Sequence, residues 1–135
     1  MPADRYLRAA ALVYAAGLVL HTADHVRRGL DTVTPAVLWA GNISTAIGLV
    51  TVVLVLSRHR LAPLAAAVTG VPIALGVAAV HLLPNWGALS DPFVGGAAAG
   101  VTIWSWTVVL VEIAGALMLG LAGALALRTA HARAA

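Results

Sequence analysis

Long apolar stretches, separated by short polar segments, dominate the pattern of this chain. Four of them stand out by length, and they cover approximately residues 7–26, 36–56, 61–83 and 101–127. A helix of about 20 apolar residues crosses the hydrocarbon core of a bilayer. Isolated strands are excluded at such positions because they leave backbone polar groups unsatisfied in lipid. The pattern therefore predicts four transmembrane helices.

Turn-forming and charged residues separate the four stretches. The first break begins at Arg27, Arg28 and Gly29, the second covers residues 57–60, and the third is a longer segment at residues 84–100 that is rich in glycine and small residues. Such residues favour turns and loops. We expect short connections at the first two breaks and a longer loop, packed back on the bundle, at the third.

Composition supports a membrane location. The chain has 135 residues, of which 61% are hydrophobic and 10% are charged. Soluble domains carry about 25% charged residues, and a soluble fold of this size cannot cover so much apolar surface. We predict an all-α, integral membrane four-helix bundle, with residues 1–135 forming a single domain of a multi-pass protein in the cell membrane.

The missing residue types exclude several kinds of chemistry. The chain has no cysteine, which excludes disulfides, thiolate metal sites and iron–sulfur clusters. All eight basic residues are arginine, so no lysine is available for a Schiff base. The arginines lie at the ends of the apolar stretches rather than on one face. We interpret them as topology signals and expect no nucleic-acid partner.

The distribution of arginines predicts the orientation of the bundle. With four spans, six arginines fall on one side of the membrane: Arg5, Arg8, Arg58, Arg60, Arg128 and Arg133. Positively charged residues favour the cytoplasmic side. We therefore expect both termini in the cytoplasm. Arg27 and Arg28 fall on the outer side and break this rule, so they need a separate explanation.

A stripe of polar residues ends the first predicted helix. Residues three, four and seven positions apart share one helix face. His21, Asp24, His25 and Arg28 follow this spacing, and Tyr14 extends the stripe inward. The stripe therefore places several ionisable groups in the outer half of the membrane.

The other three predicted helices bring polar residues to a similar depth. His81 lies near the outer end of the third helix, Asn42 about a turn and a half into the second, and Glu112 some distance into the fourth. A charged group at the centre of a bilayer costs about 2.5–3.5 kcal/mol even on insertion scales. Asp24 and Glu112 must therefore be paired, protonated or solvated. A polar pocket in the outer half of the bilayer follows from these positions.

Metal binding is the first interpretation of this pocket. Two histidines at positions i and i+4 of a helix can direct both imidazoles at one ion. We predict His21, His25 and His81 as ligands, with Glu112 or Asp24 as a fourth ligand or as an outer partner that orients an imidazole. Nitrogen and oxygen ligands suit zinc, copper or iron, and a redox role is open.

A b-type haem is the second interpretation. It needs two histidines on different helices, and His21 or His25 with His81 would serve. Arg27 or Arg28 would then pair with the propionates. In either interpretation Tyr14, Asn42, Arg27 and Arg28 are expected in a second shell or in contact with an anion.

Interpretations without a cofactor stay open. The same residues suit a proton or ion relay, a transporter, or a site for a quinone or a lipid headgroup. Glu112 and His21 can also be a hydrogen-bonded pair that only fixes the helix register. Small residues at intervals of about four, such as Gly41, Gly48 and Gly120, favour close helix contacts. They suit internal packing, a homo-oligomer, or an accessory subunit of a larger membrane complex.

Overall fold

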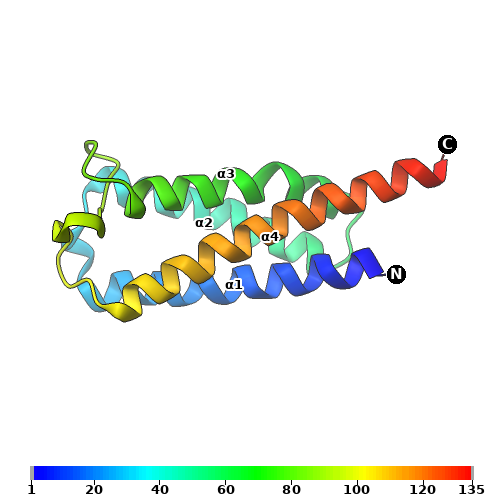
Figure 1. Ribbon diagram of the computed structural model, residues 1–135. Coiled ribbons are helices and arrows are strands. Elements are labelled where there is room, and N and C mark those ends of the chain that lie inside the picture. Colours follow the sequence, from blue (N-terminus) through cyan, green and yellow to red (C-terminus); the bar gives the residue numbers. More distant parts are fainter. Residues whose placement is uncertain (1, 135) are drawn as a thin grey trace.

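The computed structural model describes residues 2–134, with side chains from residue 4 to residue 132, as an up-and-down bundle of four helices (Figure 1). The helices are α1 (Pro2–Arg28), α2 (Pro35–Leu56), α3 (Ala62–Leu82) and α4 (Ile103–Ala134), with short 3₁₀ turns η1 (Leu30–Thr32) and η2 (Val94–Gly96). No strand occurs within residues 2–134. Each helix is long and apolar enough to cross a membrane. The predicted all-helical, four-helix fold is confirmed.

Local sequence signals explain where the helices end. Gly29 follows α1 with a φ of 95°, a conformation that glycine adopts without steric cost. The Thr34 side chain then caps α2 by accepting a hydrogen bond from Val37 N, and Pro35 occupies the first turn. At the end of α3, Leu83 is extended because it precedes Pro84. Pro72 lies inside α3, which continues through it.

Both chain ends lie at one end of the bundle, opposite the loop of residues 84–100 (Figure 1). The arginines that predict a cytoplasmic side are therefore gathered at the end that carries the termini. The side chain of Arg133 lies outside the described side chains. Which end faces the cytoplasm stays a prediction from the arginine distribution.

Glycines allow α4 to lie close against α1 and α3. A Cβ added to Gly17 of α1 would come within 2.6 Å of the Glu112 Cα, and one added to Gly115 of α4 would come within 2.7 Å of the Tyr14 backbone. On the other side of α4, a Cβ on Gly120 would meet Val71 N of α3 at 2.9 Å. These close approaches make α4 the central helix of the packing.

Much of the small-residue surface expected to mediate helix contacts is used inside the bundle. Gly120 and Ala116 face Gly70 of α3, and Gly48 of α2 faces the Tyr14 side chain. Gly41 differs, since a Cβ there would meet nothing within 4 Å. α2 makes fewer contacts with its neighbours than α4 does, and this looser packing leaves a pocket beside it.

Candidate metal centre

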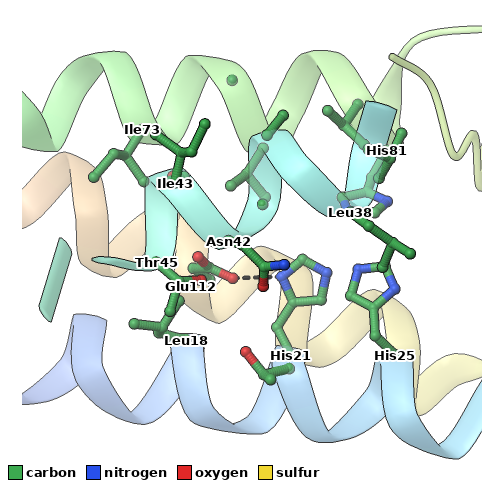
Figure 2. Close-up of a pocket in the computed structure, with 18 of the residues that line it drawn as sticks. Leu18, His21, His25, Leu38, Asn42, Ile43, Thr45, Ile73, His81 and Glu112 are labelled. Atoms are coloured by element: carbon green, nitrogen blue, oxygen red, sulfur yellow. Dashed lines mark hydrogen bonds and ion pairs between the residues drawn. The ribbon is translucent and has the colours of Figure 1, made fainter. Parts of the chain in front are cut away.

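Three histidines converge at the end of the bundle away from the termini. His21 and His25 lie one turn apart near the end of α1, and His81 lies in the last turn of α3. Each offers one ring nitrogen to a group in which these atoms all lie within 4.8 Å of one another. Figure 2 shows the imidazoles of His21 and His25 side by side, with His81 across from them. The i, i+4 spacing therefore brings two imidazoles together, as the sequence predicts.

Two ring nitrogens of this cluster are buried without a hydrogen-bond partner. They are Nε2 of His21 and Nδ1 of His25. Buried polar atoms are almost always paired, so an unpaired one requires an explanation such as an ion or a water molecule. The two atoms belong to the same three-histidine group. In the tautomer that leaves such a nitrogen without a proton, it presents a lone pair that can bind a metal ion.

Glu112 of α4 holds the other ring nitrogen of His21. Its Oε2 accepts a short hydrogen bond from His21 Nδ1, and both side chains are buried. The contact depends on Gly17, because only a residue without a Cβ lets the backbone at Glu112 come so close to α1. A proton on Nδ1 leaves the Nε2 lone pair of His21 free, which is the tautomer a metal ligand uses.

His81 is oriented by the loop that follows its own helix. His81 Nδ1 donates to the main-chain oxygen of Asp91 at 3.1 Å and lies 3.5 Å from the Asp91 carboxylate. The loop is tied back to α3 because Asp91 N donates to Val80 O at 3.0 Å and Phe93 N donates to His81 O at 2.9 Å. His81 thus has the same arrangement as His21, with Nδ1 held and Nε2 left for a ligand.

Asp91 is a site residue that the sequence did not identify. The sequence places it ten positions after His81 in a glycine-rich loop, among residues with no helical period that would fix its depth. In the structure it is buried and contacts both His81 and Arg28. The available signal was a single acid in residues 84–100, two positions before an aromatic residue, Phe93.

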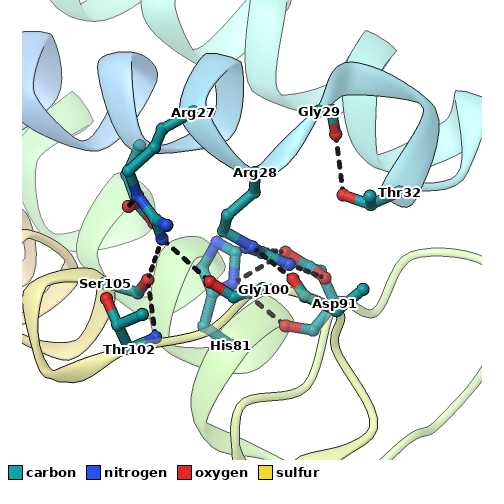
Figure 3. A network of polar contacts seen from close by, with 11 residues as sticks. Arg27, Arg28, Gly29, Thr32, His81, Asp91, Gly100, Thr102 and Ser105 are labelled. Atoms are coloured by element: carbon teal, nitrogen blue, oxygen red, sulfur yellow. Dashed lines mark hydrogen bonds and ion pairs between the residues drawn. The ribbon is translucent and has the colours of Figure 1, made fainter.

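Arg27 and Arg28 are bound by acceptors of the protein (Figure 3). Arg28 makes two hydrogen bonds to the Asp91 carboxylate, at 2.7 and 2.8 Å, and a third to Ala99 O at 2.9 Å. Arg27 contacts Asp24 at 2.8 Å and also donates to Gly100 O and Ser105 Oγ. The two residues that break the charge rule therefore fasten the loop of residues 84–100 to the end of α1.

An aromatic residue covers the cluster next to His81. The Phe93 ring lies 4.6 Å from the His81 ring and 5.5 Å from Trp106, measured between centroids. The Arg28 guanidinium lies 5.2 Å from the Phe93 centroid. Phe93 is buried, and its ring covers one side of His81. The expectation that this loop packs back on the bundle is confirmed.

The remaining predicted site residues lie around the cluster without joining the three-histidine group. Asp24 is buried and paired with Arg27, and its Oδ2 has no partner. The Tyr14 hydroxyl is buried without a partner and packs against Gly48. Asn42 of α2 is exposed and lines the neighbouring pocket (Figure 2). Glu112 is thus the acid of the predicted set that contacts a histidine of the group directly.

Comparison of the chain with protein-family models, curated proteins and solved structures finds no match. The function must therefore be inferred from the geometry of the site.

Proposed function

We propose that this membrane protein binds one transition-metal ion through His21, His25 and His81. The observation that carries the proposal is the pair of unpartnered nitrogens, His21 Nε2 and His25 Nδ1, buried within a three-histidine group. If these side chains only fixed the register of the helices, the His21–Glu112 hydrogen bond would be sufficient. The imidazoles of His25 and His81 next to His21 would then have no role.

The distances require a small adjustment on binding. Zinc–nitrogen bonds of about 2.0–2.1 Å in a tetrahedral site put two ligand nitrogens about 3.3 Å apart. The nitrogens of the cluster lie within 4.8 Å of one another. The ligand nitrogens must therefore move closer together by up to about 1.5 Å when an ion binds, and we expect changes of the imidazole side-chain torsions to supply this movement.

The partners of the ligands support a divalent ion. Metal-bound histidines usually donate their second ring nitrogen to a carboxylate or a carbonyl, which fixes the ring. Glu112 serves His21 in this way and the Asp91 carbonyl serves His81. Glu112 also supplies one negative charge, whereas Asp24 and Asp91 are already neutralised by arginines. The charge of a divalent ion in a low-dielectric site is thereby partly offset.

The donor set favours a transition-metal ion such as zinc, copper or iron. Imidazole suits zinc, copper, iron and nickel, whereas hard ions such as magnesium prefer oxygen ligands. Three histidines leave one coordination position of a tetrahedral ion open, which is the arrangement of catalytic rather than structural zinc sites. A redox role belongs to the copper or iron form, since zinc has no redox chemistry in proteins.

The spacing of the imidazoles supports an ion over a haem. The ring centroids lie 4.7 Å apart for His21 and His25, 4.8 Å for His21 and His81, and 5.6 Å for His25 and His81. A haem needs its two axial imidazoles on opposite faces of a wide macrocycle, with nothing else between them. Here three imidazoles contact one another around one point. The arginines proposed for the propionates are also bound to Asp24 and Asp91.

A proton relay is the second candidate, and the His21–Glu112 hydrogen bond is the observation in its favour. Chains of histidines and acids carry protons in membrane pumps. A relay needs no bound ion. It loses pH-dependent proton flux in Glu112→Gln, whereas the proposed metal site loses its ion in His21→Ala/His25→Ala.

Elemental analysis of the detergent-purified protein, with an absorption spectrum of the same sample, tests the proposal. We expect about one zinc or copper per chain and no Soret band. The ion should disappear in His21→Ala/His25→Ala and remain in His59→Ala/His131→Ala, which changes two exposed histidines at the opposite end. A folded, metal-free wild type that also takes up no added zinc or copper would overturn the proposal.

A further inference from the structure

A pocket of about 540 Å³ lies directly beside the three histidines, between α2 and the rest of the bundle. Its volume falls in the range of about 300–1,000 Å³ that is typical of sites for small molecules. His21, His25, His81 and Glu112 all line it (Figure 2). The open coordination position of an ion held by the histidines therefore has this pocket as its neighbour.

The pocket extends from the histidines along α3. Its ionisable lining residues are His21, His25, His81 and Glu112, and its neutral polar ones are Thr22, Asn42, Ser44 and Thr45. On α3 the lining continues from His81 through Val77 and Ile73 to Pro72. Residue 73 is eight positions before His81, which is about 12 Å at a rise of 1.5 Å per residue. The pocket thus runs from the ionisable groups along an apolar part of α3 over about this length.

The pocket is reached from the side of the bundle. Ile43 and Ile47 both line it and are 58% and 46% exposed. They belong to a helix that is long and apolar enough to span a membrane, so the exposed part of this wall faces lipid. At the end of the bundle, Phe93 packs on His81, and Arg28 ties the loop to α1 by donating to Ala99 O. An occupant would enter from the bilayer.

The charges around the pocket favour a neutral occupant. No arginine lines it, and the two nearest arginines are bound to Asp24 and Asp91. A phosphate headgroup would find no free cation there and would lie beside the Glu112 carboxylate. A hydroxyl group fits better, because it can bind the ion with its oxygen and donate to Asn42 or Glu112.

We propose that the pocket binds a neutral, lipid-soluble molecule whose hydroxyl group occupies the open position of the metal ion and whose apolar body lies along α2 and α3. This inference rests on the proposed metal site and adds the class of its ligand. A ring hydroxyl with an alkyl tail, as in alkylphenols and quinols, has the required shape.

The test uses the full-length protein in nanodiscs, loaded with Co²⁺ in place of the native ion. The visible spectrum of Co²⁺ responds to a change of its fourth ligand. The probe is 4-nonylphenol, with nonylbenzene as the analogue without a hydroxyl and phenol as the analogue without a tail. We expect 4-nonylphenol to change the spectrum at concentrations at least tenfold below those needed with phenol, and nonylbenzene to leave it unchanged.

Gly76→Leu tests the location. A Cβ added to Gly76 would meet nothing within 4 Å, so the leucine fills the pocket without pushing the helices apart. We expect this variant to keep its Co²⁺ and its spectrum. It should need at least tenfold more 4-nonylphenol than the wild type for the same change of the spectrum. The matched control is Val50→Leu, an exposed position of α2 that does not line the pocket.

The outcomes separate the two proposals. Failure to bind Co²⁺ overturns both of them. Normal Co²⁺ binding with no response to 4-nonylphenol, or with an equal response in Gly76→Leu, overturns the pocket proposal alone. A phospholipid retained at one per chain by the wild type and lost in Gly76→Leu would assign the pocket to a lipid and overturn the hydroxyl ligand.

Discussion

Arg28 and Asp91 form a buried, doubly hydrogen-bonded ion pair, 2.7 and 2.8 Å long, that connects the end of α1 to the loop after α3. The main-chain oxygen of the same Asp91 accepts the hydrogen bond from His81 Nδ1. The pair therefore links His81, a proposed ligand, to Arg28 through Asp91, which lies 63 positions from Arg28 in the sequence. This contact explains why Arg28 lies at the end of the bundle opposite to most of the other arginines, although positively charged residues favour the cytoplasmic side.

Removing one partner of this pair should lower the free energy of unfolding. Arg28→Met leaves the Asp91 carboxylate buried without its cation, and breaking a buried ion pair in this way typically costs about 3–5 kcal/mol. Arg28→Met/Asp91→Leu should recover a large part of the loss, because both charges are then gone. The measurement is unfolding in detergent, with Arg60→Met as a control at an exposed position of the opposite end. Equal losses in the single and double variants would show that the pair is not coupled.

Glu112→Gln should weaken metal binding without unfolding the protein. Glutamine keeps an oxygen that can accept the hydrogen bond from His21, but it lacks the negative charge. Changes to such partners typically lower metal affinity by about 10–100-fold. Titration of purified protein with Zn²⁺ against a competing chelator measures the change. An unchanged affinity would mean that Glu112 serves packing alone.

The Gly17→Ala and Gly41→Ala variants form a matched pair. The methyl group at position 17 would collide with the backbone at Glu112, whereas the one at position 41 would meet nothing within 4 Å. Overpacking costs about 1–3 kcal/mol, so Gly17→Ala should lower both stability and Zn²⁺ affinity. Gly41→Ala should be neutral or slightly stabilising because alanine favours the helix. Unfolding curves and Zn²⁺ titrations of both variants measure these changes. Equal changes of stability and Zn²⁺ affinity in the two variants would contradict the close α1–α4 contact.

Protons should compete with the ion for the imidazole nitrogens. A metal binds the neutral form of a histidine, so the Zn²⁺ affinity must fall once the pH is low enough to protonate the ligands. We expect this loss of Zn²⁺ affinity in the wild type at a pH at which the protein is still folded. Titrations with Zn²⁺ against a competing chelator at a series of pH values, with unfolding followed in parallel, measure it. An affinity that stays constant down to the pH at which the protein unfolds would contradict histidine ligation.

The sequence predicts much of this arrangement because helices have a fixed period. The i, i+4 spacing of His21 and His25 requires that they share a face once α1 is helical. The depth of Glu112 in the fourth helix matches that of His21 in the first, and the structure brings the two into contact. Long apolar stretches leave few alternatives to helices in lipid. The structure confirms the predicted four-helix fold.

The site contacts that the sequence does not predict lie in irregular loops or depend on how closely two helix backbones approach. Asp91 lies in a loop without a period, so nothing in the sequence relates it to His81 or Arg28. Asp24 has two arginines within reach, three and four positions ahead, and the structure pairs it with Arg27. Gly17 appears in the sequence as one more small residue, and its role emerges only from the contact with the α4 backbone.

X-ray absorption of Zn²⁺-loaded protein tests the metal site most directly, because it reports the atoms bound to the ion. We predict one Zn²⁺ per chain in the wild type, with three imidazole nitrogens at about 2.0–2.1 Å and one oxygen ligand in the fourth position. His81→Gln should lose one imidazole and most of the bound zinc. A zinc shell made only of oxygen, or an identical imidazole shell in His81→Gln, would contradict a metal site formed by His21, His25 and His81.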